Sequence, residues 1–141
     1  MPKLLTNRQY KKIDRLFFIG PAIKKELDEV QAERVAAAEK SCDPTARTSI
    51  ETIGGIPCLG GYENPVAWIG ALTETWERYN QNTEVGSAML RRYNLKESAE
   101  TTCIILAISP ATYWNWRNEF LDYAALALVR KGITLEFREP T

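Results

Sequence analysis

The chain contains no histidine, and this absence removes the side chain that most often acts as a general base at neutral pH. Catalysis by histidine-containing triads is therefore excluded. The three cysteines, Cys42, Cys58 and Cys103, form an odd set without C-x-x-C spacing, so we expect no zinc site. The glycine-rich segment GGIPCLGG at 54–61 lacks the Gly-Lys-Ser/Thr ending of a phosphate-binding loop. We expect no enzyme, no metal and no cofactor.

The chain also lacks a surplus of charge of either sign, because 18 basic residues are balanced by 18 acidic ones. Indiscriminate binding to nucleic acid depends on neutralising many phosphates, so zero net charge argues against a protein that coats DNA or RNA. It leaves room for a specific binder with a local basic patch.

No apolar run approaches the length of a membrane span, and the first residues lack the apolar segment of a secretory signal. We therefore expect a cytoplasmic protein without a membrane partner. Hydrophobic residues make up 45% of the 141-residue chain, which is normal for one globular domain or for a small domain with a helical appendage.

Residues 1–40 are predicted to be helical. Thr6 and Gln9 match a capping box, which predicts a helix beginning at Asn7. Gly20-Pro21 predicts a break and a second helix over 21–40. That helix has a thin apolar seam that could pack on the first helix or on a second copy of the chain, so the region is either a helical hairpin or a coiled-coil-like segment.

The rest of the chain also favours helices, which makes the predicted fold all-α. Residues 41–64 are a linker rich in glycine and proline. Asn64 and Pro65 predict the start of a helix whose buried stripe is Ile69, Leu72, Trp76 and Tyr79. Further helices are expected over 84–93 and from 99 onward, so 65–132 forms a helix-turn-helix domain. Residues 133–141 are a tail that forms a short strand or a docked end.

The segment AISPATYWNWRN at 107–118 predicts the turn of that motif. Ser109 is placed as the N-cap and Pro110 as the first residue of the final helix. In such motifs the first helix needs a small residue where the helices cross, and the turn needs an apolar plug. Cys103 fits the crossing point, Ala107 the turn and Ile108 the plug. Three aromatic side chains of the final helix are expected to face the core: Tyr113, Trp116 and Phe120.

The outward face of this final helix is the predicted DNA-binding surface. Asparagine can form two hydrogen bonds with adenine, and a serine-capped helix start can bind phosphate. The candidate DNA-binding residues are Ser109, Ala111, Thr112, Trp114, Asn115, Arg117 and Asn118, with Arg91, Arg92 and Lys96 for the DNA backbone. Two plainer interpretations stand beside this one. Ser-Pro junctions occur in many helical proteins, and an arginine pair is often only a solvated face.

Several segments resemble the RinA family of phage transcriptional activators. They are DPTA, NPVAWIGALTETWERY, LRRYNLKES and TTCIILAISPATYWNWRNEFLDYAALAL, within residues 41–131. The resemblance implies a helix-turn-helix similar to that of sigma factors, over about residues 96–122, with 109–118 facing DNA. It implies an activator of late or packaging genes in a bacterial host. Its partners would be double-stranded DNA, host RNA polymerase and a second copy bound through the N-terminal helices.

Two alternatives stay open at this stage. A terminase small subunit also joins a helix-turn-helix to oligomerising helices, but it would form a ring rather than a dimer. A polymerase-interacting module would bind no promoter DNA even at low salt, where electrostatic attraction is strongest. Solution size and DNA binding separate the three.

Overall fold

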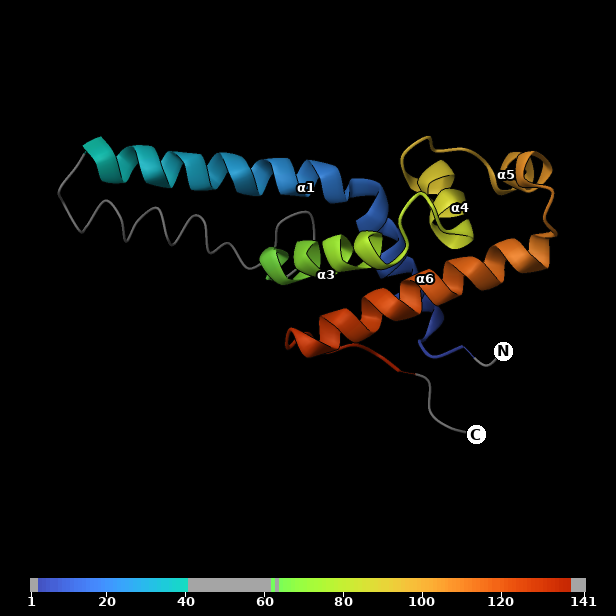
Figure 1. Cartoon of the computed structure of the whole chain (residues 1–141). Helices are drawn as coiled ribbons and strands as arrows, with labels where there is room; N and C mark the ends of the chain where they lie inside the picture. The colour runs from blue at the N-terminus through green and yellow to red at the C-terminus, as the bar shows by residue number, and fades with distance from the viewer. Residues whose placement is uncertain (1–2, 41–61, 63, 138–141) are drawn as a thin grey trace.

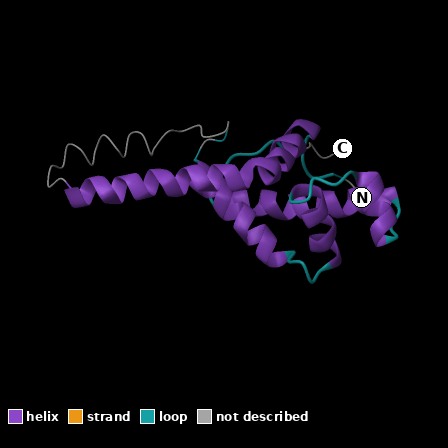
Figure 2. Ribbon diagram, turned by 90° about the horizontal axis from the view of Figure 1, so that it is seen from above, coloured by secondary structure: helices purple, strands orange, loops and turns teal. Residues whose placement is uncertain are grey.

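A computed structural model describes residues 3–40, 62 and 64–137 of the chain. This part contains α1 (Asn7–Lys40), α3 (Pro65–Arg78), α4 (Glu84–Tyr93), α5 (Ala99–Leu106) and α6 (Pro110–Arg130). Figures 1 and 2 show a helical molecule, and one antiparallel bridge pairs Leu5 with Phe137. The all-α prediction is confirmed. Except for Tyr62 and Asn64, the predicted linker lies outside the described residues.

None of the helices in the described ranges is both long and apolar enough to cross a membrane.

The predicted start of α1 is confirmed at Asn7, but only half of the capping box forms. The Thr6 hydroxyl accepts a hydrogen bond from the Gln9 amide at 3.2 Å. The Gln9 side chain does not return to Thr6, because its Oε1 accepts from the Glu136 amide at 3.0 Å. The Thr6 amide in turn donates to the Glu136 carbonyl at 3.3 Å. Glu136 therefore docks the described part of the tail, residues 133–137, against the start of α1.

The predicted break at Gly20-Pro21 is wrong. α1 continues through Pro21, so the first forty residues do not form a two-helix hairpin. Proline removes one backbone hydrogen bond and crowds the preceding turn, which kinks a helix without necessarily ending it. Ile23, just beyond the proline, is buried, and this packing carries the helix past the weak point. The second half of α1 then projects away from the other helices (Figures 1 and 2), and the coiled-coil-like alternative stays a prediction.

An aromatic cluster joins the first half of α1 to α3, α4 and α6. The ring centroids of Phe17 and Phe120 lie 4.7 Å apart, and those of Trp76 and Phe120 lie 4.8 Å apart. Tyr93 closes the cluster at 5.2 Å from Phe17. Such tilted and edge-on pairs add to the burial of large apolar area. The first half of α1 therefore shares one core with the predicted helix-turn-helix domain, and α6 is held from behind.

α3 begins at Pro65 as predicted, but Asn64 does not cap it with its side chain. The Asn64 backbone is left-handed, with φ of 50°, and its side chain makes no capping hydrogen bond. Proline at the first position already removes one of the amides that a cap would satisfy. The predicted stripe faces the core, since Ile69 and Tyr79 are buried and the other two stripe residues, Leu72 and Trp76, are partly buried.

Candidate nucleic-acid interface

Residues 107–109 form a short turn between α5 and α6. Ala107 has a left-handed backbone with φ of 55°, and the Ile108 amide donates to the Cys103 carbonyl at 3.0 Å. The Ser109 hydroxyl then accepts from the Thr112 amide at 3.1 Å, so the predicted cap of α6 is confirmed. A serine cap contributes about 1 kcal/mol to a helix. Local hydrogen bonds to α5 on one side and to α6 on the other therefore fix the conformation of this turn.

The side of α5, the turn and α6 that faces the core is apolar. Cys103 is buried, as expected of a small residue at a crossing point, and Ile108 packs against the core. Tyr113 and Phe120 are fully buried, which confirms their predicted place. Trp116 is only partly buried. These contacts set the rotation of α6 and so decide which of its residues face outward.

The outer face carries most of the predicted contact residues. Ser109, Ala111 and Asn115 are exposed, and Trp114 is 41% exposed. Thr112, Arg117 and Asn118 are partly buried. The first two turns of α6 thus present a polar and aromatic surface with its cap at one end.

Arg117 lies flat against the protein. Its guanidinium is 5.1 Å from the Trp114 ring centroid and 5.9 Å from that of Tyr10, and its Nη2 donates to Asn118 Oδ1 at 3.1 Å. The Nε atom is buried without a hydrogen-bond partner among the described residues. Stacking of this kind holds an arginine by cation–π attraction. Arg117 therefore positions Trp114 as much as it offers charge to a ligand.

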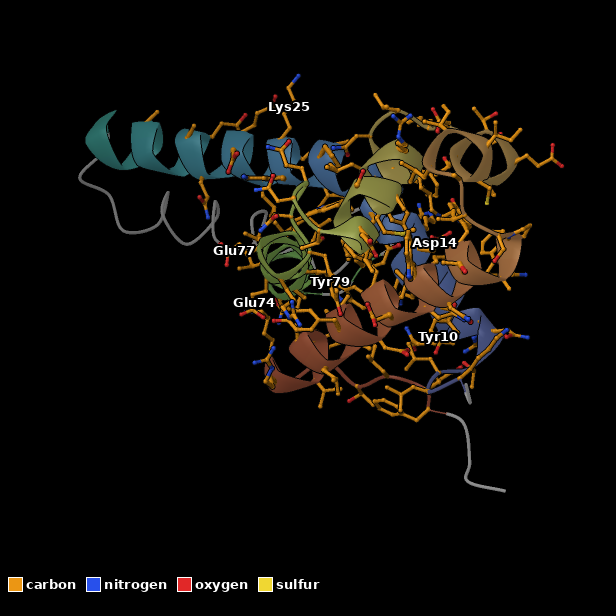
Figure 3. The ribbon with its side chains drawn as sticks, turned by 45° about the vertical axis from the view of Figure 1, so that its right-hand side comes forward. Tyr10, Asp14, Lys25, Glu74, Glu77 and Tyr79 are labelled. Carbon is orange, nitrogen blue, oxygen red and sulfur yellow. The ribbon has the colours of Figure 1, made fainter. Side chains whose placement is uncertain are left out.

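Arg92 is an interior residue, although its sequence position suggested a DNA-backbone contact. Its Nε and Nη2 donate to the two carboxylate oxygens of Asp14 at 3.1 and 2.8 Å, and its Nη1 donates to the Tyr113 hydroxyl at 3.2 Å. Figure 3 shows Asp14 where α1 meets α4 and α6. The Arg92 and Asp14 side chains are only 14% and 15% exposed.

Electrostatics reinforce this arrangement. Burial by itself lowers the pKa of the Arg92 guanidinium, but the hydrogen bond and the charge of Asp14 outweigh that effect and raise the pKa above its ordinary value. Tyr93 also donates its hydroxyl to Asp14. The pair therefore ties α4 to α1. Sequence reasoning missed Asp14 because it precedes Arg92 by 78 positions and no local pattern links them.

The other two predicted cations differ in availability. Arg91 is partly buried and forms an ion pair with Glu97 at 3.1 Å. Lys96 is exposed, with a left-handed backbone at φ of 54°, and makes no ion pair with a described residue. The positive charge offered beside the start of α6 is accordingly small.

No protein-family model, curated protein sequence or solved structure matches the chain. The resemblance to the RinA family therefore rests on the sequence segments alone, and the role that it implies is a proposal.

Proposed function

We propose that the chain is a phage-type transcriptional activator that presents the first two turns of α6 to the major groove of DNA. One observation carries the proposal. The serine-capped start of α6 is exposed, while Tyr113 and Phe120, on the opposite side of the same helix, are fully buried. In helix-turn-helix proteins the N-terminal residues of the second helix contact base edges, and rigid support makes such contacts specific.

The exposed residues suit this task. The Asn115 side chain has the donor and acceptor that adenine matches in the major groove. Trp114 offers apolar surface, and the capped helix start offers backbone amides and a positive dipole end to a phosphate. These groups can position the helix on DNA and discriminate between bases, but they add little positive charge to the surface.

The small number of cations near the start of α6 lowers the expected affinity for DNA. Arg92 pairs with Asp14 and Arg91 with Glu97, so of the four cations predicted to contact DNA only Lys96 and the stacked Arg117 remain for phosphate. A single copy should therefore bind DNA weakly and with a shallow salt dependence. A second copy or host RNA polymerase would raise the effective affinity by holding the contacts together.

Selection from a randomised pool of duplex DNA at low salt tests the proposal. The chain should enrich a defined sequence, and Asn115→Ala should reduce its preference for that sequence over a scrambled duplex by about 1–3 kcal/mol. Fluorescence anisotropy with both duplexes measures this preference. Gln81→Ala, in the exposed turn before α4, is the matched control and should leave the preference unchanged.

Equal losses by Asn115→Ala on both duplexes would contradict base reading by α6. Failure to enrich any sequence at low salt would contradict DNA binding itself.

A polymerase-interacting module without DNA binding is the second candidate. Exposed apolar side chains on α5 and just before it favour this candidate: Leu95 is 67% exposed, Ile104 80% and Ile105 50%. Clustered exposed apolar residues are typical of protein interaction surfaces. This candidate gains if the selection fails while the chain still binds purified polymerase.

A further inference from the structure

A groove of about 310 Å³ lies beside α6. Residues of α6 from Asn115 to Leu126 line it together with Tyr79, the residue that follows α3. Figure 3 labels Tyr79 where α3 approaches α6. The groove does not include the capped helix start at Ser109, but it shares Asn115 and Asn118 with the predicted DNA-binding surface.

Aromatic rings supply much of the lining. Tyr79 and Tyr123 stand edge to face with centroids 5.7 Å apart, and the partly buried Trp116 lies further along the same face. The Arg78 guanidinium already lies 5.1 Å from the Tyr79 ring centroid. Cations are attracted to the faces of such rings, and the aliphatic stems of arginine and lysine pack against them.

Two carboxylates give the groove its charge. Glu119 and Asp122 both line it, and neither forms an ion pair with a cation of the described residues. Burial raises the pKa of the Asp122 carboxyl; the hydrogen bond from the Tyr10 hydroxyl, at 2.7 Å, opposes this, and the charge of Glu119 raises the pKa further. One cation, Lys3, also lines the groove but forms no ion pair with either carboxylate. A cation placed between the carboxylates would relieve their mutual repulsion.

We propose that this groove binds a basic segment of a partner protein through an arginine side chain. The guanidinium lies against Glu119 and Asp122, and its aliphatic stem packs on Tyr123 and Leu126. Charge-assisted hydrogen bonds between guanidinium and carboxylate are among the strongest in proteins. The same carboxylates repel phosphate, so the groove does not extend the DNA surface. A partner held there would instead sit directly beside bound DNA.

The test is a titration of the ¹⁵N-labelled full chain with the peptide acetyl-Ala-Arg-Leu-Ala-Arg-Ala-amide, followed by NMR. Amide shifts should move at Tyr79 and along residues 115–126. The peptide with citrulline in place of arginine keeps the shape but loses the charge, and it should bind at least about tenfold more weakly.

Variants assign the effect to the carboxylates. The double variant Glu119→Gln and Asp122→Asn should weaken the arginine peptide by at least about tenfold, because the side chains keep their size and lose their charge. The new amide at 122 can still accept from Tyr10, so the fold should persist, and circular dichroism checks this. Glu100→Gln, on the exposed side of α5, is the matched control and should bind like the wild type.

Three results would overturn the proposal. The citrulline peptide could bind as tightly as the arginine peptide, or the double variant could bind like the wild type. Sedimentation could also show self-association that the double variant abolishes, which would make the occupant a second copy. Because no DNA is used, each of these results leaves the proposed activator function to its own test.

Discussion

Gly86→Ala is expected to destabilise the fold by about 3 kcal/mol. A methyl group at this position would overlap the carbonyl oxygens of Asn80 and Tyr79, and it would lie 2.6 Å from the Thr83 hydroxyl oxygen. The Gly86 amide also donates to that hydroxyl at 2.9 Å, which caps α4. The obstacle is backbone, which cannot move aside as a flexible side chain can. The variant must shift the turn before α4 or lose the cap.

Gly70→Ala is the matched control, since Gly70 is also a helical glycine. A methyl group there would meet only the end of the Lys131 side chain, at 3.2 Å. That side chain can swing away, and alanine favours a helix interior over glycine by about 0.5–1 kcal/mol. Urea unfolding should therefore show Gly86→Ala destabilised and Gly70→Ala unchanged or stabilised. Equal effects of the two substitutions would contradict the close approach at Gly86.

Arg92→Ala is expected to cost about 3 kcal/mol of stability, because it leaves the largely buried Asp14 carboxylate without its charged partner and with the Tyr93 hydroxyl as a remaining donor. Asp14→Asn should cost less, since the amide oxygen can still accept a hydrogen bond, but it leaves the guanidinium uncompensated. A double-mutant cycle by urea unfolding should show strong coupling between the two positions. Arg8→Gln removes the exposed Arg8–Glu136 ion pair and is the control, with an expected loss below about 1 kcal/mol.

A different result would return Arg92 to the DNA-binding surface. If Arg92→Ala unfolded like the wild type while weakening binding to all duplexes alike and flattening the salt dependence, then Arg92 would contact phosphate. The largely buried Arg92–Asp14 pair predicts the opposite: Arg92→Ala should lower the free energy of unfolding clearly and leave the salt dependence of DNA binding unchanged.

Local chemistry explains the parts of the fold that the sequence predicts well. Thr6, Ser98 and Ser109 each accept a hydrogen bond from the amide three residues on, and each helix starts directly after them. A cap is made by neighbours in the chain, so its signal is visible in the sequence. The buried aromatic stripe of α6 is equally local, because it follows helical spacing.

Long-range packing explains what local reasoning missed. Gly20-Pro21 is a strong local breaking signal, yet α1 continues because residues on both sides of it are buried against the rest of the molecule. The role of Arg92 depends on Asp14, and the groove beside α6 is completed by Tyr79, the residue after α3. None of these contacts follows from residue spacing within one helix, so they can be seen only in the packed structure.

Mapping of the contact surface by NMR shows whether the start of α6 binds DNA. The ¹⁵N-labelled chain is titrated with its selected duplex, and amide shifts are followed residue by residue. We expect the largest changes on residues 109–118, with small changes along the projecting half of α1. Tight binding with residues 109–118 unperturbed would contradict it.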